Sequence, residues 1–216
     1  MWRVSIRAAR TAETRRRLAA AALAQVAEGG YASASVTTVA ARAGVAAGSV
    51  YTHFPSKADL FAEVFRDANS AELEIVRAIA ARHDEPVPQR LAAAVEAWSR
   101  RALSAPTLAW ALMAEPVDPT VEAERLAAKR GYRDVFADLL VEGVERGELA
   151  PCDAPIVSAA IVGAMPEALL GPLAEPVGGH DALVASLISF VLHAVQAKET
   201  GPWPSRRTRH TAPTRS

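Results

Sequence analysis

The chain has 216 residues, half of them hydrophobic, and only 6% of them are aromatic. An alanine-rich composition with few strand-forming residues favours closely packed helices over sheets. No uninterrupted run of about 18 apolar residues occurs, which argues against a membrane-spanning segment. Cys152 is the single cysteine, so an internal disulfide and a cysteine metal cluster are excluded, and we expect a cytoplasmic protein with no metal and no cofactor.

The formal net charge of zero conceals a partition along the chain. Residues 1–57 carry eight Lys/Arg and two Asp/Glu, whereas residues 58–197 carry 11 and 21, and residues 198–216 carry five and one. A basic end on an acidic body suits one-sided binding of a polyanion. Basic termini can also serve solubility alone, so the charge pattern by itself does not decide between these interpretations.

Helical periodicity and the residues between the periodic segments predict an all-α protein of about nine helices. The first should end at Gly29-Gly30. The predicted ranges in chain order are about 13–28, 36–43, 47–53, 57–82, 89–104, 106–113, 119–147, 154–170 and 179–198. We therefore divide the chain into a small N-terminal domain (11–71), a larger C-terminal helical domain (72–198) and a disordered basic tail (199–216).

Capping residues support several of these boundaries. Ser35 is a suitable N-cap for the second helix, and Gly44 can adopt the positive φ that a tight helix exit requires. Ser56 and Asp59 form a capping box before the fourth helix. In the eighth helix, Asp153 is the expected N-cap, Pro166 should produce a kink, and Gly171-Pro172 should end it.

The segment at about 34–54 predicts a helix-turn-helix, because two short helices meet at a glycine-containing turn. Small apolar side chains can fix their crossing: Val39, Ala40, Ala43, Val45 and Val50. Such a unit presents the outer residues of its second helix to the major groove of DNA.

Residues 13–65 resemble the N-terminal domain of the tetracycline-repressor (TetR) family. The resemblance rests on the combined spacing of Ala21-Ala22, Gly30-Tyr31, Ser35-Val36, Val39-Ala40, Ala43-Gly44-Val45, Gly48-Ser49-Val50-Tyr51, His53-Phe54 and Ser56-Lys57-Ala58-Asp59-Leu60. It covers about a quarter of the chain, and the remainder matches the family only in length and helix count.

The resemblance implies a set of DNA-contacting residues: Thr37, Thr38, Ala47, Gly48, Ser49, Tyr51, Thr52, His53 and Lys57. Tyr51 and His53 would contact the DNA backbone, and Lys57 would hold a phosphate together with the dipole of the fourth helix. Ala46-Ala47 departs from the polar or basic side chains that the family often has there, which predicts modest base discrimination. Tyr51 could instead be a core aromatic, Lys57 an ordinary solvated lysine, and Arg15-Arg16-Arg17 either a solvated face or a flank of the duplex.

For the C-terminal domain, the resemblance implies an effector pocket between helices five, six and seven and a dimer bundle made by helices eight and nine. The large side chains expected at the pocket are Trp98, Trp110, Met113, Tyr132, Phe136 and Met165. Each of them could equally fill the core. The expected dimer residues are Ile161, Leu169, Leu183, Leu187, Phe190 and Val191.

The functional hypothesis is a homodimeric repressor that binds a palindromic DNA operator and is released by a small hydrophobic effector. The alternative is an activator or constitutive DNA-binding protein without an effector. An enzyme is disfavoured, because the five histidines have no metal-ligand spacing and no nucleophile or phosphate-loop motif occurs. Cys152 lies near a helix N-terminus, where a thiol can be acidified, but a lone cysteine argues against a redox switch.

Overall fold

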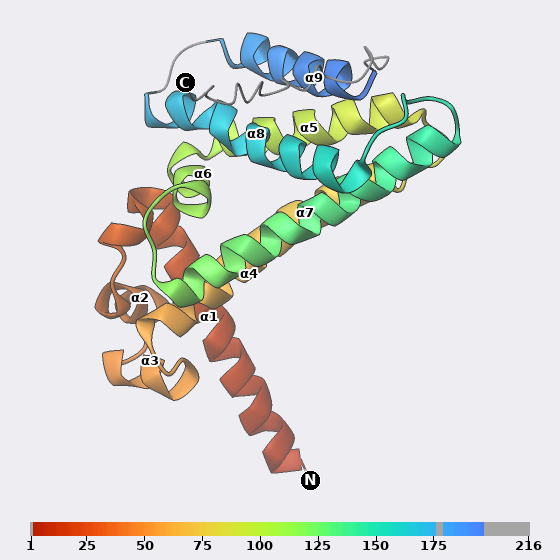
Figure 1. Ribbon diagram of the computed structural model, residues 1–216. Coiled ribbons are helices and arrows are strands. Elements are labelled where there is room, and N and C mark those ends of the chain that lie inside the picture. Colours follow the sequence, from red (N-terminus) through yellow and green to blue (C-terminus); the bar gives the residue numbers. More distant parts are fainter. Residues whose placement is uncertain (1, 176–178, 197–216) are drawn as a thin grey trace, which may run out of the picture.

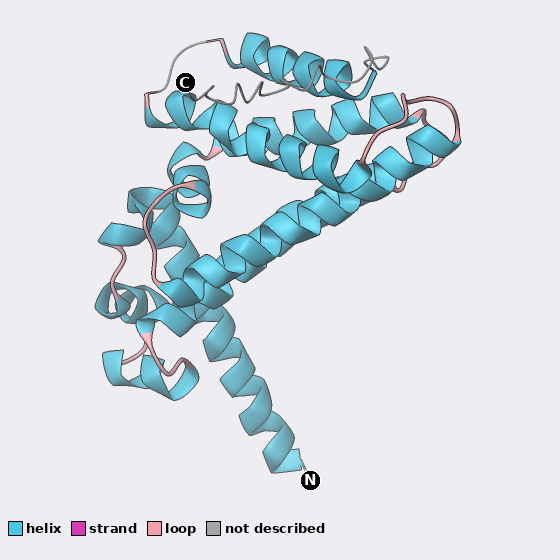
Figure 2. Ribbon diagram, in the orientation of Figure 1, coloured by secondary structure: helices cyan, strands magenta, loops and turns pink. Residues whose placement is uncertain are grey.

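The computed structural model describes residues 2–175 and 179–196, which form helices joined by short loops (Figures 1 and 2). Residues 197–216, which include the predicted basic tail, lie outside the described residues. The described part contains the expected nine helices: α1 (Trp2–Ser33), α2 (Val36–Ala43), α3 (Ala47–His53), α4 (Lys57–Ala80), α5 (Val87–Ser104), α6 (Pro106–Met113), α7 (Pro119–Glu145), α8 (Ala154–Ala174) and α9 (His180–Gln196).

The α1 helix differs from the prediction at its N-terminal end, because it begins at Trp2 and not near Glu13. The segment that was expected to precede the helix contains no glycine or proline, so nothing in it interrupts helix propagation. At the other end, Gly30 has a φ of 77° and separates the long helix from a final turn that carries Tyr31. This left-handed residue redirects the chain toward α2.

Two long helices connect the halves of the molecule. The α4 and α7 helices run side by side along the diagonal of Figure 1, with α1, α2 and α3 at one end and α5, α8 and α9 at the other. Val76 of α4 and Phe136 and Leu140 of α7 are almost completely buried in the core of the larger half. A movement of either long helix therefore changes the position of the N-terminal domain relative to the C-terminal core.

The α8 helix continues beyond its predicted end, passing through Gly171 and Pro172 to Ala174. Proline costs a helix one backbone hydrogen bond. Burial of Leu173 beside Leu169 and Val184 compensates for that loss in the last turn. The prediction that Gly171-Pro172 ends the helix is therefore wrong.

By length and composition alone, α8 is apolar enough to cross a membrane. In the structure this helix packs along α7 and also contacts α5, α6 and α9. Ile161 and Met165 are buried in the shared core. These contacts account for only part of the apolar composition of α8, because 33% of its apolar window is buried inside the protein.

A buried charge stabilises the junction of α4, α5 and α7. The Arg90 side chain is 1% exposed and pairs with both carboxylate oxygens of Glu142, at 2.5 and 2.9 Å. It also donates to the backbone carbonyl of Ala80 at the end of α4. Hydrogen bonds from Arg90 lower the pKa of Glu142 to about 2, with smaller contributions from Arg146 and His83.

Candidate nucleic-acid interface and internal cavity

The α2 helix has the ends that its sequence predicts. The Ser35 hydroxyl accepts a hydrogen bond of 3.2 Å from the Thr38 N–H at the N-terminus. At the C-terminus, Gly44 adopts φ 65° and ψ 38°, and its N–H donates to the Ala41 carbonyl at 3.1 Å. Both capping predictions are confirmed, and the tight exit at Gly44 turns the chain into α3 within a few residues.

A small apolar cluster fixes the crossing of α2 and α3. Val39, Ala40, Ala43 and Val50 are each at most 3% exposed, and Val45 packs against them from the turn. Because alanine occupies two of these positions, the helices can approach closely. The predicted cluster is therefore present and holds α3 against the body of the domain on one side only.

The other side of the helix-turn-helix faces outward. Tyr51 is 56% exposed, which excludes the interpretation of Tyr51 as a core aromatic. The nine residues predicted to contact DNA divide into an exposed group and a half-buried group. The exposed group is Thr37, Thr38, Ala47, Gly48, Tyr51 and Thr52, and the half-buried group is Ser49, His53 and Lys57.

Arg15 and Arg17 brace this unit from α1. Arg15 pairs with Glu63, donates to the His53 carbonyl at 2.5 Å and lies over the Phe54 ring at 4.2 Å. The Arg17 guanidinium donates to the Ala43 carbonyl at the end of α2. These two side chains therefore position the helix-turn-helix, a role that their sequence pattern did not reveal because their partners lie 26 to 48 positions away. Arg16 pairs only with Glu13 on its own helix.

Lys57, in the first turn of α4, has a defined position and is not an ordinary solvated lysine. Its ammonium lies 5.0 Å from the ring centroid of Tyr31 and 5.6 Å from that of Phe61. The helix start is held by Ser56, whose hydroxyl accepts from the Asp59 N–H at 3.1 Å and donates to the Asp59 carboxylate at 2.7 Å. A half-buried cation is thus held in the first turn of α4, where the positive end of the helix dipole also favours a phosphate.

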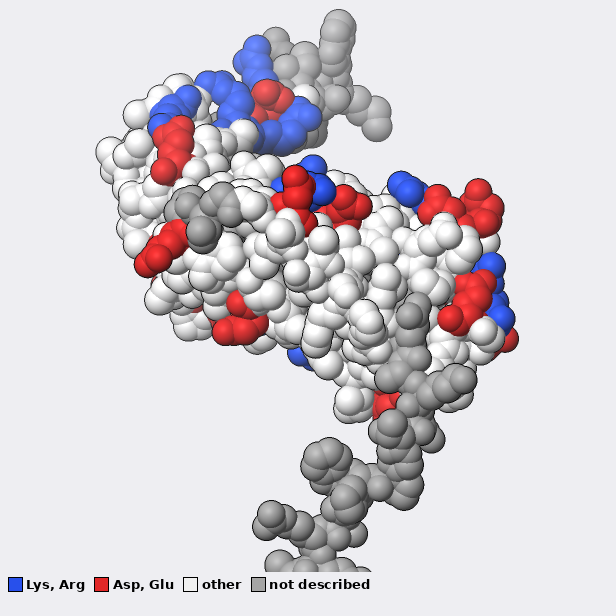
Figure 3. All heavy atoms as spheres, turned by 90° about the horizontal axis from the view of Figure 1, so that it is seen from above, with Lys and Arg blue, Asp and Glu red and all other residues white. Residues whose placement is uncertain are grey.

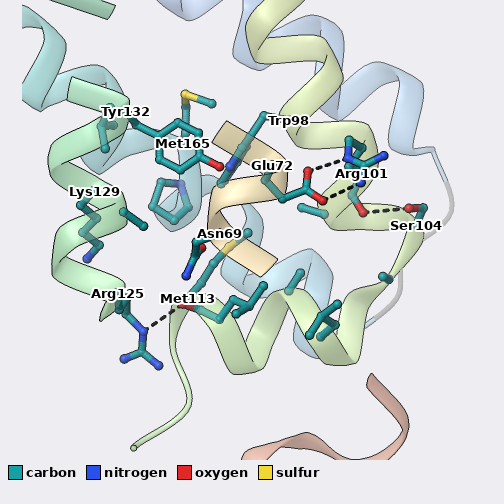
Figure 4. Close-up of a pocket in the computed structure, with 18 of the residues that line it drawn as sticks. Asn69, Glu72, Trp98, Arg101, Ser104, Met113, Arg125, Lys129, Tyr132 and Met165 are labelled. Carbon is teal, nitrogen blue, oxygen red and sulfur yellow. Dashed lines mark hydrogen bonds and ion pairs between the residues drawn. The ribbon is translucent and has the colours of Figure 1, made fainter. Parts of the chain in front are cut away.

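The C-terminal half encloses a cavity of about 230 Å³ between α4, α5, α6, α7 and α8 (Figure 4). Five of the six large side chains predicted to surround a pocket line it: Trp98, Met113, Tyr132, Phe136 and Met165. Trp110 is not among the lining residues. It packs instead against the apolar cluster that contains Ala102, Leu169 and Val184.

Polar groups that the sequence analysis did not identify also reach this cavity (Figure 4). Glu72 and Arg101 form a two-bond ion pair at 2.5 and 2.6 Å. The Nδ2 atom of Asn69 is buried without a hydrogen-bond partner, and Lys129 makes no ion pair with any described residue. The sequence did not indicate these four residues, because they lie on three different helices and form no motif.

Comparison with known families gives two adjoining matches. Residues 18–64 match the family of bacterial regulatory proteins of the tetR type, and residues 84–168 match a tetracyclin repressor-like C-terminal domain. The chain belongs to the TetR family. No curated protein matches its sequence significantly, so the family and the solved structures provide the comparison.

Several solved structures share the fold over most of their length. The regulator FadR from Bacillus subtilis, solved with stearoyl-CoA, is 21% identical, with a TM-score of 0.72 over 83% of this chain and 98% of that one. FadR from Bacillus halodurans is 23% identical, with the same TM-score over 83% and 94%. RolR, solved with resorcinol, is 19% identical, with a TM-score of 0.64 over 87% and 90%.

TetR membership confirms the predicted fold class and the prediction that the chain is a DNA-binding transcriptional regulator and not an enzyme. Members of the TetR family act as dimers and respond to small molecules. The small N-terminal unit built on α2 and α3 is accordingly the DNA-binding part, and the C-terminal half has the ligand-binding fold.

The predicted dimer residues occupy two different environments. Ile161, Leu169, Leu187 and Val191 are at most 5% exposed within the single chain, so they form its core and not its surface. Leu183 is half-buried, whereas Phe190 is 53% exposed. A wide apolar arc predicts that its side chains are buried, but it does not say what buries them. Here the chain's own helices bury four of the six predicted dimer residues.

Cys152 also differs from the expectation. Burial and the neighbouring Asp153 carboxylate raise the pKa of the thiol, so it is less acidic than a free cysteine. Asp153 does cap α8 as predicted, since its carboxylate accepts from the Ile156 N–H at 3.1 Å.

Proposed function

We propose that this TetR-family chain is a ligand-released repressor that binds a palindromic operator in the cytoplasm as a homodimer. The helix-turn-helix would enter the major groove with Tyr51 and Thr52 outward, while Lys57 would contact a phosphate. The observation that carries the proposal is a chain of contacts from the cavity to the DNA-binding domain. It begins at Arg125 and ends at Lys57.

The first contact lies at the end of α6. Arg125 lines the cavity and is 8% exposed. Its guanidinium donates to the carbonyls of Leu112, Ala111 and Glu115, at 2.9, 3.0 and 2.8 Å. These carbonyls have no partner within α6, so Arg125 determines how this helix ends. A ligand that displaces Arg125 would release them.

The second contact joins the loop after α6 to α1. The buried Glu115 carboxylate accepts hydrogen bonds from the Tyr31 N–H at 2.7 Å and the Ala32 N–H at 2.8 Å. Gly30 permits this approach, because a Cβ there would lie 2.9 Å from Glu115 Oε2. The loop after α6 therefore holds the last turn of α1 directly.

The third contact reaches the DNA-binding face. The Tyr31 hydroxyl donates to the Asp118 carboxylate in the same loop. The Tyr31 ring supports Lys57 and meets the ring of Phe61 edge-on at 5.3 Å. Movement of the loop would therefore move the lysine and the start of α4 together. Strong release of the operator would require that the ligand favour one of the two loop positions by about 3–5 kcal/mol.

The dimer contact is proposed for the outer faces of α8 and α9. Seen from above, the side on which α9 lies in Figure 1, the molecule has a broad surface area without Lys, Arg, Asp or Glu (Figure 3). Asp181 is the one charged residue in the described part of α9, and Glu167 is the one in α8. Phe190 of α9 and Ile156 of α8 are 53% and 66% exposed. Such a face suits isologous pairing of two copies.

The proposed effector is a small hydrophobic molecule. This proposal rests on the cavity and on the likeness to FadR, whose B. subtilis form was solved with stearoyl-CoA. The test is an electrophoretic mobility shift of the purified dimer on DNA upstream of its own gene, with and without candidate ligands. Specific retardation that a cavity ligand reverses would support the proposal. Retardation that no ligand changes would favour a constitutive DNA-binding protein, and absence of specific retardation would overturn the operator assignment.

A further inference from the structure

The polar groups around the cavity restrict the chemistry of its ligand. Resting on the proposed function, we infer that the cavity takes an amphipathic molecule with an anionic, hydrogen-bond-accepting head, and not a wholly apolar one. The head would lie between Asn69 of α4 and Lys129 of α7, and the apolar body would lie among Trp98, Phe136 and Met165 (Figure 4).

Glu72 is the one carboxylate among the described lining residues, and it is already paired. Both carboxylate oxygens of Glu72 accept from Arg101. The Ser104 hydroxyl donates to the Arg101 carbonyl at 2.8 Å, within its own helix. Arg125 is held by backbone carbonyls and by Glu122. A positively charged ligand would therefore find no unpaired carboxylate in the described lining.

The donor groups, in contrast, are available. Asn69 Nδ2 is buried and donates to no acceptor in the described part of the chain. A buried amide donor without a partner costs free energy, so an acceptor supplied by a ligand gains that amount on binding. The Tyr132 hydroxyl can donate as long as the phenol is protonated. Burial raises the pKa of Tyr132, so the phenol stays protonated.

Lys129 supplies the charge. It is half-buried at the cavity, on the face of α7 that also carries Arg125 and Tyr132. Of the three cations in the lining, Arg101 and Arg125 are paired with carboxylates, whereas no described carboxylate pairs with Lys129. An anion placed between Lys129 and Asn69 would neutralise the unpaired cation and satisfy the orphaned amide together.

The remaining lining is apolar and fits the body of such a ligand. Leu108, Phe136, Val162 and Met165 contribute hydrocarbon or thioether surface from three helices. The cavity volume of about 230 Å³ suits a medium alkyl chain or a small ring system. Medium-chain carboxylates are therefore appropriate probes.

The test is isothermal titration calorimetry of the full chain with three probes of equal chain length: decanoate, 1-decanol and decylamine. Decanoate should bind tightest. Lys129→Met should weaken decanoate binding about tenfold and leave 1-decanol unchanged. Arg130→Met is the matched control, because Arg130 is the exposed neighbour outside the cavity, and it should leave all three affinities unchanged.

Asn69→Leu provides an independent variant, since it removes the buried donor at similar volume. It should weaken decanoate binding without lowering the thermal stability of the free protein. Equal or tighter binding of 1-decanol or decylamine would overturn the inference, as would identical behaviour of the Lys129 and Arg130 variants or no binding of any probe. Operator binding is measured separately, without ligand. A failure to bind the operator would therefore contradict the proposed function and not this inference.

Discussion

The Glu115 carboxylate accepts a hydrogen bond of 2.7 Å from the Tyr31 N–H, across 84 positions of sequence. Because this bond connects the loop after α6 to the end of α1, Glu115→Gln should loosen the coupling between cavity and operator. We expect ligand affinity to stay within about twofold and ligand-induced loss of operator affinity to fall several-fold. The measurement is operator affinity, by fluorescence anisotropy, with and without a cavity ligand.

The matched control for that experiment is Glu122→Gln. Glu122 also pairs with Arg125, but it forms no hydrogen bond or ion pair with the described residues of α1, so the variant should preserve the coupling. Equal effects of the two variants would show that the Glu115–Tyr31 contact carries no special role.

Tyr51→Ala should weaken operator binding at least about tenfold and leave the melting temperature unchanged. Its side chain is 56% exposed and contributes little to the core, so its loss removes contacts with DNA only. Anisotropy and thermal unfolding together separate these effects. Thr120→Ala, at an exposed position in the first turn of α7, is the control and should change neither quantity. A Tyr51 variant with normal operator affinity would remove α3 from the interface.

Lys57→Met should reduce the salt dependence of operator binding. The thioether chain can still pack over Tyr31 and Phe61, while the charge is lost. One phosphate contact per subunit predicts that the slope of log K against log salt becomes shallower by about two per dimer. Titrations at four salt concentrations provide the slope, and Lys129→Met, far from α3, should leave it unaltered. An unchanged slope for the Lys57 variant would mean that this lysine only stabilises the aromatic cluster.

Phe190→Glu should shift the dimer toward monomer, because it places a charge on the exposed apolar surface of α9. Sedimentation velocity across a concentration series measures the change. Val141→Glu is the control, since Val141 is 47% exposed on α7, and it should stay dimeric. If Val141→Glu dissociates the dimer and Phe190→Glu does not, the subunits meet elsewhere.

The lowered pKa of Glu142 predicts that its contribution to stability is lost in acid. Its pKa is lowered from 4.5 to about 2 by the hydrogen bonds from Arg90, so its stabilisation is complete above about pH 4.5 and is lost as the pH falls toward 2. Glu142→Gln should cost about 3 kcal/mol at neutral pH, because it leaves a buried guanidinium uncompensated. The free-energy difference from wild type should shrink below pH 4.5. Urea unfolding at several pH values tests this, with the exposed neighbour Glu145→Gln as an unaffected control.

Local chemistry predicted much of the secondary structure. The caps at Ser35, Gly44, Ser56 and Asp153 depend on atoms within a few positions of each other, and each is present. Where a predicted helix end was wrong, a tertiary contact overrode the local signal. Pro172 would end an isolated helix, but burial of Leu173 keeps α8 intact.

The sequence by itself therefore determined the helix order, the helix-turn-helix and the outward position of α3, because periodicity and capping encode them within short segments. Only the tertiary structure decided which apolar side chains face inward, so that Val191 is buried while the adjacent Phe190 remains on the surface. It also decided the partners of Arg15, Glu115 and Lys57. Their contacts join segments up to 84 positions apart, and side-chain charge alone does not specify a partner at that separation.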